Sequence, residues 1–324
     1  MCEMRKNMKA KIGTNLFTGI RPTGALTVAN YVGAVQPLLD VQEKESGIMV
    51  FVADLHALTD NEPSVAREYT KEVVADYIAL GLDPKKVTIF VQSKIASEIN
   101  MLTLFLARHI SVAELLRVPT LKEKLKEKER PENANALLFL YPVMMAADIL
   151  IQRAQGVPVG EDQVPHIEVT RKLAKRFNDA YGEIFPLPKA YAIKPVRILS
   201  LKGDGKMSKS SPEGAIFLTD TKESVEKKIQ RAQTSVEGEM NEVLQSHFLL
   251  AQSLCSDEPK KQILEEMQKQ HMNGTPIMGE FKKLFIEITL EFLETFQKKR
   301  AQLLLDTSFI DDLLEKGNKK AREN

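Results

Sequence analysis

The sequence contains no tryptophan, and its two cysteines, Cys2 and Cys255, stand far apart among 324 residues. Neither belongs to a C-x-x-C pair or a Cys/His cluster, so neither a disulfide framework nor a zinc site is indicated, and we predict no metal-binding side chains. No apolar run reaches the length of a membrane span, and no apolar signal segment follows the basic residues at the start. These absences favour a cytoplasmic protein with no membrane partner.

An excess of one charge is also lacking, because 45 basic and 44 acidic residues leave a formal net charge of +1. A nucleic-acid partner would therefore have to meet a local basic patch, since the overall field gives no attraction. Hydrophobic residues make up 43% of the chain. A chain of this length can bury a full core and is predicted to form two domains.

Short apolar runs alternate with helical patterns over the first two thirds of the chain. This alternation predicts βαβ units on a parallel sheet, an α/β fold of the Rossmann-like type. Strands are expected at 16–20, 48–53, 87–91, 157–160 and 196–201, and helices at 64–80, 97–117 and 133–151. From about residue 220 the pattern becomes helical throughout. We therefore predict a parallel-sheet domain over 1–213, with a helical insertion at about 97–151, and an all-helical domain over 214–324.

The first predicted strand is followed by a tight turn and a helix. Pro22 and Gly24 mark the turn, and apolar residues at helical spacing run from Val28 to Val35. Pro37 stands inside this helical pattern and is expected to kink or end the helix. In the insertion, the charged run KEKLKEKERPEN (122–133) is typical of a solvated helix end or loop.

The stretch GDGKMSKSS (203–211) places Lys206 and Lys209 three residues apart. It is not a Walker A loop, because Met207 follows Gly205-Lys206, and it lacks the third glycine of a dinucleotide fingerprint. Composition alone favours a solvated lysine-rich turn. The position after the last predicted strand, at the carboxyl ends of a parallel sheet, instead favours a mobile loop that grips and releases a polyphosphate.

Five motifs follow one another in a recognisable order. KMSKS (206–210) is similar to the signature loop of the class I aminoacyl-tRNA synthetases, and GIRPTGALTVANYVGA (19–34) resembles their HIGH-type motif, with Thr27 to Asn30 in its tetrapeptide positions. The remaining motifs are FVADLHALT (51–59), YPVMMAADILI (141–151) and VGEDQVPHIEVTRKLAKRFN (159–178). Together they resemble the tryptophanyl-tRNA synthetase family, which also predicts the α/β fold.

The resemblance implies an activity and its partners. ATP activates tryptophan to the adenylate with release of pyrophosphate, and tryptophan is then transferred to the terminal ribose of a tRNA. Mg²⁺ is expected to bind to the ATP phosphates. The 214–324 region is expected to bind the tRNA anticodon, and the protein is expected to form a homodimer. The implied catalytic residues are Thr27, Asn30, Lys206 and Lys209. Residues implied at ATP are Arg21, Thr27, Ala29, Asn30, Gly160, Asp162, Lys206, Met207, Ser208 and Lys209.

Met145 and Asp148 distinguish tryptophan from tyrosine among the substrates of these enzymes. They lie three residues apart on one helix face, with Tyr141 one turn earlier. Met145 can pack against an indole ring, and Asp148 can accept its N–H. By family resemblance, tyrosyl enzymes have glutamine where Met145 stands. The implied tryptophan site consists of Phe17, His56, Tyr141, Met145, Asp148 and Gln163, while His166 is interpreted as a helix-packing residue.

Two positions depart from the family pattern. Ala29 stands where glycine is usual, and its methyl group is expected to cost ATP binding roughly 1–3 kcal/mol unless the backbone moves. Arg21 stands where bacterial members usually have glutamine, and it can pair with the substrate carboxylate or α-phosphate, or point to solvent. These departures leave two alternatives: a tryptophan- or tRNA-binding regulator that does not charge tRNA, and a tyrosyl-specific relative.

Overall fold

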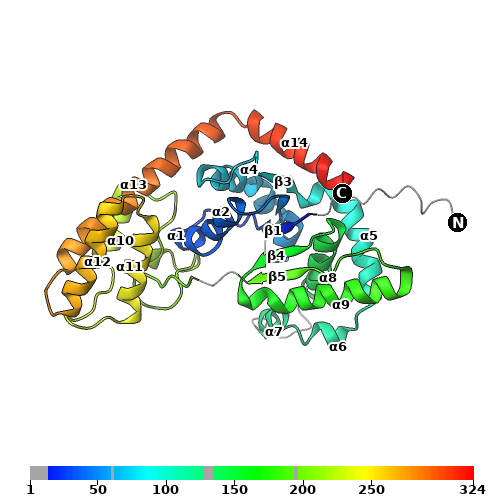
Figure 1. Ribbon diagram of the computed structural model, residues 1–324, viewed down its shortest axis with the longest axis horizontal. Helices are drawn as coiled ribbons and strands as arrows, with labels where there is room; N and C mark the ends of the chain where they lie inside the picture. Colours follow the sequence, from blue (N-terminus) through cyan, green and yellow to red (C-terminus); the bar gives the residue numbers. More distant parts are fainter. Residues whose placement is uncertain (1–13, 60–61, 127–133, 193–195) are drawn as a thin grey trace.

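A computed structural model describes residues 14–59, 62–126, 134–192 and 196–324. Five parallel strands form one sheet in the order β3-β2-β1-β4-β5, with helices on both sides of it (Figure 1). The strands are β1 (Leu16–Ile20), β2 (Ile48–Val52), β3 (Val87–Val91), β4 (Gly156–Val159) and β5 (Lys189–Ala192). This order confirms the predicted Rossmann-like α/β class. The N-terminal extension and the end of the charged run, 127–133, lie outside the described residues.

The strand order has a switch point between β1 and β4. The chain builds outward from β1 through β2 to β3, and β4 then returns to the other side of β1, where Gly156 pairs with Leu16. Ligands of open α/β sheets bind outside the carboxyl ends of the strands at such a point. The fold therefore directs attention to the residues that follow β1 and β4.

The helices between the strands agree in part with the predicted ranges. Helices α4 and α8 fall close to the expected 64–80 and 133–151, whereas the expected 97–117 helix is split, because Ser111 caps a new helix start. The helices are α1 (Val28–Asn30), the π-helix η2 (Tyr31–Val35), α2 (Gln36–Gln42), α3 (Asp54–Ala57), α4 (Pro63–Ala79), the 3₁₀ turn η3 (Gln92–Ile95), α5 (Ala96–Ala107), α6 (Val112–Leu115), α7 (Pro119–Lys126), α8 (Ala136–Ile151), the 3₁₀ turn η5 (Glu161–Gln163) and α9 (Val164–Tyr181).

Pro37 does not end the first helical segment, which continues to Gln42. The five residues Tyr31–Val35 form a π-helical turn directly before the helix that contains Pro37. Because proline has no N–H to donate to the preceding turn, the wider π turn accommodates the missing hydrogen bond.

The predicted strand at 196–201 is wrong, because β5 completes the sheet instead. Among the described residues of 196–201, the pairing is an isolated antiparallel bridge from Leu199 to Lys206. The segment is therefore one arm of a hairpin that leads into the stretch GDGKMSKSS (203–211), which we call the lysine loop. Its apolar residues are buried in a different place, since Ile198 and Leu201 join the core cluster that contains the C-terminal helices.

The C-terminal part consists of the 3₁₀ turn η6 (Pro212–Gly214), α10 (Lys222–Gln230), α11 (Glu242–Leu254), α12 (Glu258–Met272), α13 (Met278–Leu305) and α14 (Ser308–Glu323). Figure 1 shows that α13 runs back from this helical cluster toward the sheet. Arg300 of α13 pairs with Glu72 and Asp76 of α4 at 2.7 and 2.5 Å. Helix α14 then packs against the edge strand β3. No helix in the described part of the chain combines the length and apolar character needed to cross a bilayer.

Candidate active site

A cavity of about 460 Å³ opens at the carboxyl ends of β1 and β4, at the switch point of the sheet. It has the size of a small-molecule site and a mainly apolar wall with a few polar groups, as such sites usually do. The predicted residues that line it are Phe17, Arg21, His56, Tyr141, Met145, Gly160 and Gln163. Motifs far apart in the sequence therefore meet around one cavity.

Aromatic rings form one wall of the cavity. Phe17 of β1 stacks on Phe51 of β2, with ring centroids 4.8 Å apart, and Phe90 of β3 packs beside them. A side chain at Gly19 would meet the Phe51 ring at 2.6 Å, so glycine is required there for this stacking. Flat rings on adjacent strands give a wall suited to a planar ligand.

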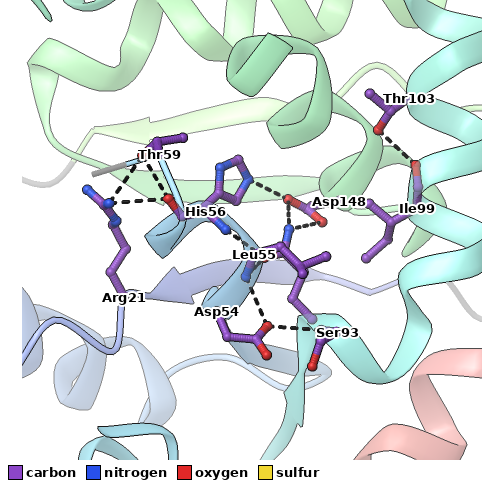
Figure 2. Close-up of polar contacts among 10 residues, drawn as sticks. Arg21, Asp54, Leu55, His56, Thr59, Ser93, Ile99, Thr103 and Asp148 are labelled. Carbon is purple, nitrogen blue, oxygen red and sulfur yellow. Dashed lines mark hydrogen bonds and ion pairs between the residues drawn. The ribbon is translucent and has the colours of Figure 1, made fainter. Parts of the chain in front are cut away.

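His56 and Asp148 form a buried polar pair at the cavity (Figure 2). His56 lines the cavity, and its Nε2 lies 2.8 Å from Oδ2 of Asp148, which is 1% exposed. Gln92 of η3 donates to both oxygens of the same carboxylate at 2.9 Å. Burial raises the pKa of Asp148, while the hydrogen bonds from His56 and Gln92 lower it. Of this pair, His56 lines the apolar cavity, and the Asp148 carboxylate is held against it, outside the residues that line the cavity.

Arg21 lines the same cavity and is held by hydrogen bonds to the α3 region. Its guanidinium donates to the His56 carbonyl at 3.2 Å and to Thr59 Oγ1 at 3.4 Å (Figure 2). At the β4 side, Gly160 directly precedes the turn η5, and the Gln163 amide donates to exposed Asp162 at 2.7 Å. Arg21, Gly160 and Gln163 thus supply polar groups to the cavity wall.

Thr27 and Asn30 form a capping box at the start of α1. The Thr27 backbone N–H donates to Asn30 Oδ1 at 2.9 Å, and the Asn30 N–H donates to Thr27 Oγ1 at 3.3 Å. Thr27 is buried, and Ala29 packs into the core next to it. The capping box orders the turn after β1. Its bonds use the side-chain oxygens of Thr27 and Asn30 and do not use the Asn30 amide N–H₂.

The lysine loop is joined to this turn by backbone pairing. The Val28 N–H donates to the Ile216 carbonyl at 2.9 Å, and the Leu218 N–H donates to the Leu26 carbonyl at 2.8 Å. The segment just after KMSKS is thereby held beside the segment just after β1. The loop thus reaches the carboxyl end of the sheet without following a sheet strand.

The two lysines of the loop differ in their surroundings. Lys209 is half-buried, and its ammonium donates to the Gly24 carbonyl at 2.9 Å and lies 3.4 Å from Thr23 Oγ1. Burial lowers the pKa of Lys209, and the charge of Asp76 partly opposes this shift. Lys206 is exposed, Met207 between them is buried, and the Ser208 hydroxyl bonds to that of Ser210 at 2.9 Å.

The family model that matches residues 9–294 describes class I tRNA synthetases for tryptophan and tyrosine. The chain belongs to this family. Among relatives of this class I synthetase, the tryptophan–tRNA ligase of Rhodopirellula baltica is 38% identical over 311 residues, covering 95% of this chain and 94% of the relative. That of Porphyromonas gingivalis is 34% identical over 318 residues, with 95% and 94% covered.

Solved structures of this family have the same fold. The tryptophanyl-tRNA synthetase of Campylobacter jejuni, in complex with ADP and tryptophan, superposes with a TM-score of 0.82 at 30% identity and 95% coverage of both chains. A tyrosyl-tRNA synthetase of Archaeoglobus fulgidus reaches 0.69 at 21% identity, which shows the shared fold alone. The predicted family and an ATP-using aminoacyl-tRNA ligase are confirmed.

The synthetase cavity also contains residues that the sequence did not predict. Thr120 and Lys124 line it from α7, and Lys124 belongs to the charged run 122–133 that was expected to be solvated. The Thr120 hydroxyl lies 2.9 Å from that of Tyr141 and 2.6 Å from Nε2 of His166. His166 is thus buried, as a packing residue would be, but it is also hydrogen-bonded to the cavity wall. Leu121 and Leu125, buried four residues apart, were the signal for a helix here.

Proposed function

We infer that this class I synthetase is a tryptophan–tRNA ligase. It joins tryptophan to ATP as an adenylate with release of pyrophosphate, and then transfers tryptophan to the 3′-terminal ribose of a tRNA. The observation that carries this proposal is the aromatic cavity at the switch point, with Met145 in its wall and the buried His56–Asp148 pair beside it. The named relatives support the same reading.

The cavity chemistry supports tryptophan over tyrosine. An indole has a broad apolar surface and one N–H donor, and Met145 and Phe17 offer matching apolar contacts. Each carboxylate oxygen accepts two hydrogen bonds, so Asp148 has capacity for the indole N–H beside His56 and Gln92. A side chain whose donor does not reach that position leaves the remaining lone pair of Asp148 unused in an apolar site, and a site built around a hydrogen-bonded group discriminates on the order of 10⁴-fold. Tyr141 and Gln163 are proposed at the amino-acid backbone.

The phosphate end of the site is proposed to work by charge neutralisation. Lys209 would exchange the Gly24 carbonyl for the β- and γ-phosphates and stabilise the departing pyrophosphate together with Lys206. Asn30 would donate from its amide at the start of α1. The charged side chains around the cavity, such as Arg21 and Lys124, are cationic and suit phosphates. Mg²⁺, which gives up its waters reluctantly, would therefore be carried mainly by the ATP phosphates.

The remaining partners are proposals of the same kind. We assign the anticodon end of the tRNA to the helices of 214–324, and the catalytic steps to 1–213. A second copy of the chain would cover the exposed apolar side chains of α5, Met101, Leu104 and Phe105. The cytoplasm, where ATP and uncharged tRNA occur together, is the compartment that fits these substrates.

Amino-acid-dependent ATP–pyrophosphate exchange tests the activation step. We expect exchange with tryptophan and at least 10³-fold less with tyrosine, in keeping with the discrimination estimated for the indole N–H. In Lys209→Ala the exchange rate should fall by roughly 10²–10³-fold, because a preorganised charge at the leaving group is lost. Lys222→Ala, an exposed lysine on α10, is the matched control and should exchange at the native rate.

The regulator alternative gives a different result. Tryptophan would bind but no exchange would occur at any ATP concentration. Restoration of exchange by Ala29→Gly would then locate the loss at the ATP-binding turn. Exchange with tyrosine in place of tryptophan would overturn the assigned specificity and favour the tyrosyl-specific relative.

A further inference from the structure

Gln92 is a fully buried polar residue with every side-chain group hydrogen-bonded. It is the first residue of η3, directly after β3, and is 0% exposed. Its amide N–H₂ donates to Oδ1 and Oδ2 of Asp148, both at 2.9 Å. Its carbonyl oxygen accepts the backbone N–H groups of Leu55 at 3.1 Å and His56 at 3.3 Å. A buried amide with this many bonds is oriented by its surroundings.

The orientation of this amide has one solution. If nitrogen and oxygen exchanged places, the N–H₂ group would face two backbone N–H donors and the carbonyl would face a carboxylate. Both contacts would be repulsive and four hydrogen bonds would be lost. Gln92 therefore presents two donors to Asp148 and an acceptor to the first turn of α3.

Through these bonds Gln92 joins three elements at the cavity. It lies at the end of β3, binds the backbone of His56 on α3 and holds the carboxylate of Asp148 on α8. The His56 ring is itself 2.8 Å from Asp148, so the positions of ring and carboxylate depend on the same amide. In an apolar setting, an acceptor deprived of two donors also takes up a proton more readily and ceases to be an acceptor.

We propose that Gln92 is a positioning residue for tryptophan binding, which holds the Asp148 carboxylate and the His56 ring where the indole N–H is received. This rests on the proposed function, since it assigns tryptophan to the cavity. Gln92 does not line the cavity in the described structure and acts through Asp148 and His56. Its loss should therefore weaken tryptophan binding while leaving ATP binding unchanged.

The test is equilibrium binding of tryptophan by its own fluorescence, because the chain contains no tryptophan. Gln92→Met keeps an unbranched side chain but removes all four hydrogen bonds, and should raise the Kd for tryptophan at least 10-fold at every pH. The KM for ATP in pyrophosphate exchange should change less than twofold. Gln152→Met is the matched control, because Gln152 is also a fully buried amide, bonded to the Ala321 carbonyl at 3.0 Å away from the cavity.

Gln92→Glu gives a second test, the pH dependence of the Kd for tryptophan, which would not change if Gln92 had only a packing role. The introduced carboxyl would face Asp148, with His56 and Asp54 as the other titratable groups nearby on α3. Burial and the Asp148 charge raise the pKa of the introduced carboxyl. Below that pKa it donates one hydrogen bond, and above it the two carboxylates repel. The ratio of variant to native Kd should therefore fall at least fivefold from pH 8 to pH 6, whereas for Gln92→Met it should not fall, because protonation of Asp148 at lower pH removes the acceptor.

Several outcomes would overturn the proposal. Kd values in both Gln92 variants no higher than in Gln152→Met would reduce Gln92 to a packing residue, and a flat pH profile for Gln92→Glu would do the same. If Gln92→Met fails to fold, the pH profile of Gln92→Glu decides alone. A native chain that binds tryptophan without exchange would end the ligase proposal but not this one, whereas a chain that binds no tryptophan would end both.

Discussion

Two buried histidines make the stability of this chain depend on pH at the scale of single residues. Burial lowers the pKa of both His166 and His247 to about 4, from an ordinary value of 6.5. The unfolded chain therefore binds more protons than the folded chain between these values. Stability from each neutral histidine is present above pH 6.5 and is lost as the pH falls toward 4.

His247→Gln tests this linkage. Each pKa unit corresponds to about 1.4 kcal/mol, so the native free energy of unfolding should fall by about 3 kcal/mol more than that of the variant between pH 6.5 and pH 4. Urea unfolding at fixed pH values measures the difference. Parallel pH profiles for the two proteins would mean that the folded state accepts the proton on His247 without cost.

The site residues that the sequence predicted are those inside recognisable motifs. Phe17, His56 and Met145, which the resemblance implied at tryptophan, line the cavity. Gln92 and Thr120 were missed because their partners are 56 and 21 residues away and nothing in their local pattern marks them. A buried amide is visible only after the fold has brought a carboxylate to it.

At the scale of elements, the strands that the sequence predicted are those with continuous apolar runs. β1, β2 and β3 consist mainly of buried residues and read as buried parallel strands, although β3 is an edge strand of the sheet. β5 escaped prediction because KAYA is a short edge strand between prolines, whereas the apolar run 196–201 packs into the helical core instead. An apolar run in the sequence indicates that the segment is buried, but burial alone does not show that the segment is a strand.

Helix α14 contacts β3 so closely that a glycine is required between them. A Cβ at Gly317 would collide with the Ile89 carbonyl, and the Asn318 side chain next to it accepts the Val91 N–H at 2.9 Å. Gly317→Ala should lower the free energy of unfolding by at least about 2 kcal/mol, because backbone cannot give way as a side chain can. Hydrogen exchange should speed up at Val91.

Gly279→Ala is the control for that substitution. Gly279 lies near the start of α13, and a Cβ there would meet nothing within 4 Å. Alanine at this position should leave stability unchanged or raise it by up to about 1 kcal/mol, since alanine favours the helix. Equal losses in both variants would show that the effect comes from helix composition and not from the contact between α14 and β3.

At the scale of the whole molecule, the C-terminal helices tie the last residue to the beginning of the described part of the chain, at Thr14. Arg300 of α13 is bound to the acidic residues of α4, and Asn324 donates to Thr14 at 3.1 Å and to Gln152 at 3.0 Å. The edge of the sheet at β3 is thereby covered, which protects it from pairing with another strand. Helix α5 also carries exposed apolar side chains, Met101, Leu104 and Phe105.

That face carries the prediction about assembly. Leu104 is 67% exposed, with Met101 and Phe105 beside it on α5. If a second copy covers them, native protein should sediment with twice the monomer mass. Leu104→Lys should weaken the dimer by at least 100-fold, because a charge would be buried in an apolar contact.

Leu305→Lys is the control. Because this residue is 90% exposed on α13, the substitution should leave the dimer intact. A native monomer in sedimentation velocity at micromolar concentration would contradict the proposed homodimer, and equal effects of both substitutions would place its interface elsewhere.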